Sequence, residues 1–471
     1  MAETTTRPGL RLDDRALAIA VPVLGLLVRL AYVISRRHDE VGGDAYYFHN
    51  QANLIADGHG FINPLVFAYA DIERAAADHP PLYSAYLAVW SLLGVDTPLG
   101  HMVASALLGT VTVVLVGAAG HRLGGSRVGI LAATAAAVHP NLWLWDGMLL
   151  SETASAFTVA LYLYLAVRFV ETPTPPRLAA VGASIGLAAL ARSEMVLLTV
   201  GLVTLVPLLP RVVARARARP GVLGVLDRVT ATRVGAAGVA VACLVLVVVP
   251  WSAYNQGRFT HPVPLSTGAG LVLVSSNCDL TYEGPLIGYW SFVCSVDGGL
   301  EAGTDPFDDA SETDRKLREV AIDFARDHPD RIPYVAAARL GRVVGLFRPF
   351  QQVGLLNQNE GVPRWISEVN VGTWYLFAGL AVVGGRRLRR EGVPIAALVT
   401  PLATVLVVAV LVYGIWRFRA PGDVAVCLLA AVGADALVRR FLEGDAPVPA
   451  PAEASSPAPV RRVTRRRAPE A

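Results

Sequence analysis

Asp44 stands in a setting that could make its carboxylate a proton acceptor. It follows Gly42 and Gly43 and comes shortly before Tyr46. A carboxylate held at a helix start beside a membrane surface can accept a proton from an incoming hydroxyl group. Flanking glycines let the backbone approach a substrate closely. The structural alternative is that Asp44 only caps a helix beginning at Ala45.

Other ionisable residues lie at the edges of apolar stretches. Glu152 begins one such stretch, Arg192 and Glu194 interrupt another, and Arg417 and Arg419 precede a third. Because charged groups near the membrane core are costly, they are default candidates for function. Each has an alternative: Glu152 suits a helix dipole, Arg192 can pair with Glu194, and the last two arginines can snorkel. On an extended segment the last two could face one site, but on a helix they would diverge.

The composition places these residues in a membrane protein. The chain has 471 residues, of which 54% are hydrophobic and only 17% are charged, whereas soluble domains have about 25% charged residues. The mean hydropathy is +0.47. This composition lacks the charged exterior that a soluble single or double domain needs. No basic patch combines with aromatic residues in open sequence, so we expect no nucleic-acid partner.

Ten apolar runs are long enough, or nearly so, to cross a bilayer as helices. We therefore predict an all-α polytopic membrane protein of about ten transmembrane helices, with juxtamembrane helices and an extracytoplasmic α(+β) segment. The predicted spans are 15–35, 99–119, 127–145, 150–170, 178–191, 195–210, 234–251, 371–385, 394–413 and 421–441. The apolar run 80–94 is assigned as a juxtamembrane or re-entrant helix, because counting it as a span would divide the basic loops between the two faces.

The basic loops give the orientation. With ten spans, the Arg-rich loops and both termini fall on one face, which the positive-inside rule makes cytoplasmic. The expected organisation is a cytoplasmic N-terminal segment, a transmembrane catalytic core with a first extracytoplasmic loop, an extracytoplasmic segment, C-terminal transmembrane helices and a disordered basic, Pro-rich cytoplasmic tail. These parts are, in order, 1–14, 15–251 with the loop 36–98, 252–370, 371–441 and 442–471. The predicted location is the plasma membrane.

The outer segment 252–370 is too long and polar to be a plain connector. We expect a charged helix at 312–328, an amphipathic helix at 333–348 and strand or extended backbone at 263–276. Cys278 and Cys294 both lie in this segment, on the oxidising side, where a disulfide is expected; the alternative is two unpaired thiols.

Several short motifs, taken in order, resemble the GT-C glycosyltransferases, and most closely the bacterial branch related to protein mannosyltransferases and lipid A aminoarabinose transferases. Each motif is weak alone, but all lie on the predicted outer face. They are Gly43-Asp44 with Tyr46-Tyr47, Ala52 and Gly58, His79-Pro80-Pro81-Leu82-Tyr83, Ser151-Glu152, Leu190-Ala191-Arg192, Pro250-Trp251, Asn255, Ser266-Thr267-Gly268 and Arg417-Phe418-Arg419-Ala420-Pro421. Two departures are Tyr254-Asn255, where the branch often has Arg-Asn, and the unmatched segment 276–370.

The resemblance implies that Asp44 is the catalytic base of an inverting transfer from a polyprenyl-phosphate sugar to a cell-envelope glycan, lipid or protein. It places His79 near the phosphate. The leaving phosphate also needs cations, for which the candidates are Arg192, Arg417 and Arg419. Expected contacts to acceptor or sugar come from Glu152, Tyr46, Tyr83 and Asn255. Since the phosphate–C1 bond of the donor is already activated, we expect no cofactor and no metal.

Two other function classes fit a polytopic chain. A polyprenyl-lipid or solute transporter, or flippase, without transferase activity would have interfacial charges, but it usually shows inverted repeats; the sequence shows none. A structural partner that docks envelope proteins through its outer segment is the third hypothesis. The identities of the sugar and the acceptor and the oligomeric state are not encoded in any motif.

Overall fold

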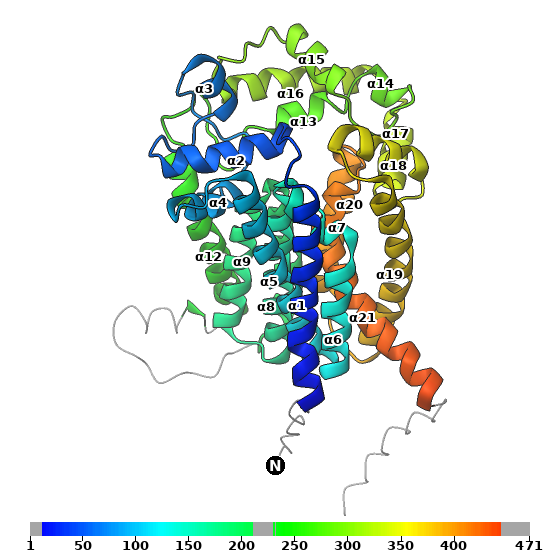
Figure 1. The fold of residues 1–471 in the computed structure, drawn as a ribbon. Helices are drawn as coiled ribbons and strands as arrows, with labels where there is room; N and C mark the ends of the chain where they lie inside the picture. The colour runs from blue at the N-terminus through cyan, green and yellow to red at the C-terminus, as the bar shows by residue number, and fades with distance from the viewer. Residues whose placement is uncertain (1–11, 211–228, 231, 444–471) are drawn as a thin grey trace, which may run out of the picture.

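The computed structural model describes residues 12–210, 229–230 and 232–443. The described chain is helical, and a β-bridge joins Ile62 to Ala75. Long helices stand side by side in a bundle, and shorter helices cover one end of it (Figure 1). The predicted all-α polytopic class is confirmed.

Six helices are long and apolar enough to cross a membrane. The rest of the bundle consists of shorter apolar helices, so the predicted count of ten spans is not established by length. The six are the helices α1 (Leu12–Ser35), α5 (Pro98–Gly124), α8 (Glu152–Glu171), α12 (Arg233–Tyr254) and α19 (Arg364–Arg390), and η4 (Arg417–Arg419) continued by α21 (Ala420–Glu443). The helix at the predicted span 371–385 is longer than expected, because it begins at Arg364.

Breaks in the shorter helices create the site. Pro140 ends one predicted span early, and Arg192, in extended backbone, ends another. The short elements are α6 (Ser126–Val138), α7 (Pro140–Trp143), η1 (Asp146–Met148), α9 (Pro175–Ala191), η2 (Ser193–Leu198), α10 (Thr199–Leu205), η3 (Val206–Leu208) and α20 (Ala396–Leu411). Residues next to such breaks can point side chains across the bundle, because they are free of helical geometry.

The first loop and the outer segment share one end of the bundle, opposite the end where α1 begins (Figure 1). The first loop forms α2 (Gly43–Ala56), α3 (Pro64–Ala70) and α4 (Leu82–Leu92). The outer segment forms α13 (Ala269–Val274), α14 (Asp279–Tyr282), α15 (Phe292–Glu301), α16 (Ala310–Asp327), α17 (Ile332–Val343) and α18 (Pro349–Glu360). These two sets of helices make up the cap of the bundle.

Strand or extended backbone was expected at 263–276; no strand forms there, and the second half of the range is helical. Residues 263–268 are irregular and α13 follows, so residues 232–443, all described, contain no strand. The charged helix expected at 312–328 is present as α16, whereas the amphipathic helix expected at 333–348 ends at Val343. The expected N-terminal segment 1–14 and tail 442–471 lie almost entirely outside the described residues.

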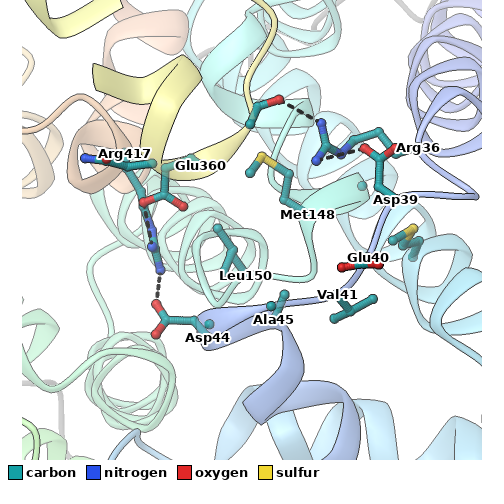
Figure 2. A pocket seen from close by; sticks show the side chains of 16 residues that line it. Arg36, Asp39, Glu40, Val41, Asp44, Ala45, Met148, Leu150, Glu360 and Arg417 are labelled. Carbon is teal, nitrogen blue, oxygen red and sulfur yellow. Dashed lines mark hydrogen bonds and ion pairs between the residues drawn. The ribbon is translucent and has the colours of Figure 1, made fainter. Parts of the chain in front are cut away.

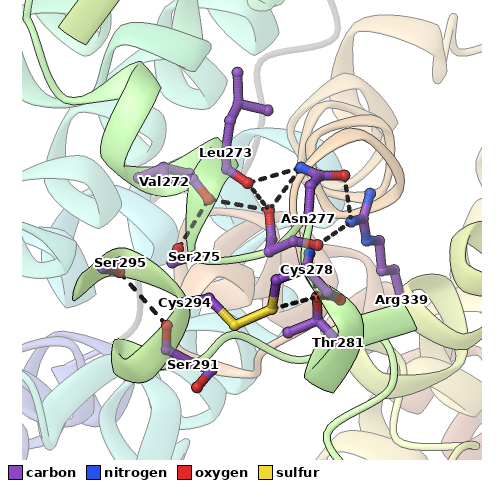
Figure 3. The surroundings of a disulfide bond; sticks show 11 residues. Val272, Leu273, Ser275, Asn277, Cys278, Thr281, Ser291, Cys294, Ser295 and Arg339 are labelled. Carbon is purple, nitrogen blue, oxygen red and sulfur yellow. Dashed lines mark hydrogen bonds between the residues drawn. A yellow bond between two sulfur atoms is a disulfide. The ribbon is translucent and has the colours of Figure 1, made fainter. Parts of the chain in front are cut away.

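A disulfide between Cys278 and Cys294 joins the start of α14 to α15 in the cap (Figure 3). Next to it, the buried Arg339 of α17 donates from Nη2 to the Ser276 carbonyl at 2.6 Å. Arg339 Nη1 donates to the carbonyl of Val410 in α20 at 3.2 Å. This part of the cap is therefore tied covalently within itself and by hydrogen bonds to the bundle below.

Candidate functional site

Asp44 lies in the first turn of α2, where the chain turns from the bundle into the cap. Gly43 begins α2 with a φ of 57°, a conformation that glycine adopts without strain. Gly42 is the N-cap residue and no side chain caps the helix, so Asp44 does not have the capping role considered above. Its side chain is 37% exposed, and Oδ2 lies 2.5 Å from Nη2 of Arg417 (Figure 2).

Arg417 is the centre of the site. It begins the 3-10 turn η4, and its side chain is only 11% exposed. Besides Asp44, it contacts Glu152 through Nε at 2.7 Å and Glu360 through Nη1 at 3.3 Å. One guanidinium thus joins α2, the first residue of α8 and the last residue of α18.

Arg192 places a second guanidinium beside Arg417. Its Nη1 lies 2.7 Å from the same Glu152 oxygen that Arg417 contacts, and its Nε lies 2.6 Å from Glu194. The guanidinium also stands 4.4 Å from the ring centroid of Phe418. Because Glu152 is fully buried, it is the carboxylate that holds the two arginines together.

His79 approaches Asp44 from the first loop. Its Nε2 lies 3.7 Å from Oδ1 of Asp44, on the side away from Arg417's contact with Oδ2. The imidazole packs between the rings of Tyr47 and Phe48, with centroid distances of 5.0 and 4.7 Å. The ring is therefore held in place, with a nitrogen directed toward Asp44.

A cavity of about 380 Å³ opens beside Asp44 and Arg417. Its lining combines carboxylates and two arginines with apolar side chains and glycine backbone. Figure 2 shows Asp44, Arg417 and Glu360 on one side and Arg36 and Asp39 on the other. Met148, Leu150 and Val41 supply apolar surface. The cavity can accommodate a polar group of about the size of a sugar residue or two.

Charge at the site shifts the titration of two carboxylates. Burial alone would raise the pKa of Asp44, but Arg417, His79 and Arg192 outweigh burial and lower the pKa to about 2. Burial raises the pKa of Glu360; Arg417 opposes this shift, whereas the Asp44 charge adds to it. Asp44 is therefore ionised at every working pH, and Glu360 is the carboxylate more easily protonated.

Several residues expected at the site lie elsewhere. Arg419 points away, with its Nε 2.9 Å from Oδ1 of Asp423. The Tyr83 hydroxyl is fully buried against Ser105 at 2.8 Å.

Asn255 braces a loop, because its amide donates to the Val263 carbonyl at 3.2 Å and it is buried. Tyr46 is half-buried on α2, two residues after Asp44. The predicted residues that do meet at one place are Asp44, His79, Glu152, Arg192 and Arg417.

Comparison with known proteins gives a family for part of the chain. Residues 78–219 match the family model described as dolichyl-phosphate-mannose-protein mannosyltransferase. This stretch includes His79, Glu152 and Arg192. No curated protein matches the sequence.

Solved structures extend the likeness to most of the chain. The Archaeoglobus fulgidus oligosaccharyltransferase, tethered to an acceptor peptide containing an NVT sequon, aligns with 90% of this chain at 14% identity and a TM-score of 0.50. The match covers 50% of that protein, so the chain spans about half its length. At this identity the likeness is one of fold. ArnT from Cupriavidus metallidurans, bound to undecaprenyl phosphate, also aligns over 90% of the chain and 78% of ArnT, with 16% identity and a TM-score of 0.39.

Glu360 is the site residue that sequence reasoning missed. It lies in the segment 276–370, which carries none of the GT-C motifs. The available signal was Gly361, which follows Glu360 with a φ of 65° and ends α18. A carboxylate just before a glycine helix end, a few residues from a membrane span, is a candidate for a position at the membrane edge.

Proposed function

We propose that the chain is a membrane glycosyltransferase that moves a monosaccharide from a polyprenyl-phosphate donor to a hydroxyl group of a cell-envelope glycan, lipid or protein. The observation that carries the proposal is the contact between the Asp44 carboxylate and Arg417, with Arg192 and His79 beside them, at one end of a membrane bundle. The matched family is named for a sugar carried on dolichyl phosphate, which is a polyprenyl phosphate.

The reaction is a single displacement at the sugar carbon C1. The acceptor oxygen attacks C1 as the bond from C1 to the phosphate oxygen breaks, and the acceptor proton passes to Asp44. Attack opposite the leaving phosphate inverts the configuration at C1. The phosphate gains one negative charge in this step, and positive groups fixed beside it lower the barrier.

Arg417 and Arg192 supply the positive charge for the leaving phosphate. An arginine has five N–H donors, and the ion pairs with described residues use three donors of Arg417 and two of Arg192. The remaining donors are available to phosphate oxygens. Glu152 keeps both guanidiniums in place while they bind, because its buried carboxylate contacts each of them.

The same contact controls the basicity of Asp44. A carboxylate with a pKa of about 2 is a weak base while Arg417 holds it. As charge grows on the leaving phosphate, Arg417 turns its interaction from Asp44 toward the phosphate. Asp44 then becomes a better proton acceptor at the moment when the acceptor hydroxyl loses its proton.

The cavity beside Asp44 is the acceptor side of the site. Its wall carries the carboxylates of Asp39, Glu40 and Glu360 in addition to Asp44. These carboxylates can accept hydrogen bonds from hydroxyl groups of the acceptor, and Arg36 and Arg417 line the same cavity. The reaction uses no cofactor and no metal, and transfer should continue in EDTA.

The active site lies on the extracytoplasmic side of the plasma membrane, and both termini are cytoplasmic. The distribution of arginines supports this orientation, because Arg386–Arg390 form the end of α19, which runs away from the capped end (Figure 1). Membrane lipids surround the bundle, and the lipid-linked donor reaches the site from the same leaflet.

Substitution of Asp44 tests the proposed function. Membrane vesicles containing Asp44→Asn or Asp44→Ala are incubated with radiolabelled polyprenyl-phosphate sugars and extracted acceptors. We expect each variant to lose at least about a hundredfold in transfer rate, since general-base catalysis contributes about 10² to 10⁴. Asp57→Asn, at the other end of α2, is the matched control and keeps wild-type transfer. Full transfer by correctly inserted Asp44 variants would refute the proposal.

A further inference from the structure

We propose that Asp423 and Asn141 are positioning residues that hold the turn η4 so that Arg417 faces Asp44. The proposal rests on the proposed function, in which Arg417 binds the leaving phosphate. It assigns a role to polar groups that touch neither Asp44 nor the cavity. It also gives a role to Arg419, which was expected to bind phosphate.

A buried polar network lies directly behind η4. Asp423, in the first turn of α21, is fully buried, as are Asn141 and the adjacent His139 of the bundle. The Asn141 amide donates to Oδ2 of Asp423 at 2.7 Å, and Nε of Arg419 lies 2.9 Å from Oδ1. His139 Nε2 stands 3.7 Å from Oδ2 of Asp423.

The partners of Asp423 form hydrogen bonds that hold the chain on both sides of Arg417. On one side, the Asn141 amide donates to the carbonyl of Trp416 at 2.9 Å. On the other side, Arg419 donates from Nη1 to the Val343 carbonyl at 2.9 Å. The Arg419 guanidinium also lies 3.9 Å from the ring centroid of Trp374. Trp416, immediately before Arg417, and Arg419, two residues after it, are thus fixed to α7, α17, α19 and α21.

Because Trp416 and Arg419 are held, the geometry of η4 determines where the Arg417 side chain points. A 3-10 helix has about three residues per turn, so side chains two apart diverge by roughly 240°. Arg419 is held toward Asp423, and Arg417 is therefore turned toward Asp44 and Glu152. Release of Arg419 or of the Trp416 carbonyl would let the turn rotate.

Filling this buried space does not by itself require polar or charged side chains. Buried ion pairs can often be replaced by well-packed apolar side chains without loss of stability, because desolvation offsets their attraction. A charged pair with an amide and an imidazole, all within a membrane bundle, therefore indicates a demand on geometry. The demand that the structure shows is the placement of Arg417.

Binding of undecaprenyl phosphate to the purified full chain in nanodiscs tests the proposal. Asn141→Ala, Asp423→Asn and Arg417→Met are compared singly, and each of the first two is combined with Arg417→Met. We expect Asn141→Ala to weaken binding about tenfold in the wild-type background and less than twofold when Arg417 is already Met, as coupled residues do. Equal loss in both backgrounds would overturn the proposal.

The buried pair Arg29–Asp146 provides a matched control. Arg29 Nε lies 2.9 Å from Asp146 Oδ2, and both side chains are fully buried. The pair is not part of the network behind η4. Asp146→Asn should act equally in both Arg417 backgrounds. Should Asp423→Asn fail to fold, Asn141→Ala still carries the test, because it leaves the Arg419–Asp423 pair intact.

A ligand-independent measurement separates this proposal from the proposed function. Absence of undecaprenyl phosphate binding by the wild-type protein would count against the proposed donor. An experimentally determined structure of Asn141→Ala would still decide the positioning role. We expect the contact between Arg417 and Asp44 to be lost in that variant, and an unchanged contact would overturn the proposal.

Discussion

Arg417 binds three carboxylates that come from separate parts of the chain. The sequence suggested both Asp44 and Arg417, since charged residues near apolar runs are conspicuous. It could not decide between Arg417 and Arg419, because a spacing of two residues favours one common face in extended backbone and divergence on a helix. The turn at Arg417–Arg419 is a 3-10 helix, so the two side chains diverge. Glu360 was not predicted, because no motif marks the segment in which it lies.

The pH dependence of transfer should report the contact between Arg417 and Asp44. The pKa of Asp44 is lowered to about 2, so Asp44 remains ionised as pH falls from 7 to 4. The acid limb of the transfer rate therefore lies below the usual aspartate pKa, which is about 3.9. Arg417→Gln removes the largest lowering influence. We expect the residual activity of this variant to fall with acid at a higher pH than in wild type, whereas Arg417→Lys keeps the charge.

The measurement is the rate of transfer in vesicles between pH 7 and pH 4, with the lipid-linked donor saturating. An acid limb at the same pH in Arg417→Gln and Arg417→Lys would show that Arg417 does not set the ionisation of Asp44.

Under the proposed function, Glu360 competes with the donor phosphate for Arg417. Its Oε1 lies 3.3 Å from Arg417 Nη1, and the side chain is 14% exposed. Glu360→Gln removes a negative charge from the place where the phosphate must bind. We expect the KM for the lipid-linked donor to fall several-fold, because losing an ion pair worth about 1 kcal/mol changes a binding constant about fivefold. A raised KM would mean that Glu360 contacts the substrate directly, and Glu319→Gln, on the exposed face of α16, is the control.

At the scale of helices, apolar runs predicted where the bundle helices lie, because a bilayer requires long uninterrupted apolar helices. The same reasoning failed at 263–276, whose Ser, Thr, Gly and Val content favours strand. There the backbone of Gly270 donates to Asp314, and a side chain at Gly270 would meet the Asp314 backbone. Close packing of α13 on α16 outweighs the local preference, as is common for strand propensity.

Close contact between α19 and α21 depends on Gly384. A Cβ atom at Gly384 would collide with the Leu429 carbonyl of α21, and one at Gly433 would collide with Leu380 of α19. Small residues let membrane helices approach this closely. We expect Gly384→Ala to lower the free energy of unfolding by about 1–3 kcal/mol through overpacking.

Gly385 provides the neighbouring control, because a Cβ atom there would meet no other atom within 4 Å. Thermal unfolding in detergent is the measurement. A Gly384→Ala variant as stable as Gly385→Ala would contradict the packing argument.

At the scale of the whole molecule, the first loop and the outer segment meet over one end of the bundle (Figure 1). Arg74 of the first loop donates to the carbonyl of Pro306 at 2.8 Å, and the Thr267 amide donates to the carbonyl of Ala77 at 2.7 Å. Charge patterning in the sequence placed both segments on one face. It could not place residues 276–370, because their contacts are long-range and no motif marks them.

The orientation of the bundle can be tested by cysteine labelling in intact cells. Tyr69 is 89% exposed in the first loop, and Arg390 is exposed at the opposite end of α19. A membrane-impermeant maleimide should label Tyr69→Cys from outside and Arg390→Cys only after permeabilisation. The unmodified chain, with Cys243 and Cys427 within helices, gives the background. The reverse pattern would place Asp44 in the cytoplasm.

The pairing of Asp44 with Arg417 has a consequence for biosynthesis. The partners are separated by 373 residues, and the fragments between them supply the other charges. A nascent polypeptide cannot assemble a competent centre until nearly its entire length has been threaded into the bilayer. Under the proposed function, terminated products that lack Arg417 are therefore inactive in sugar transfer.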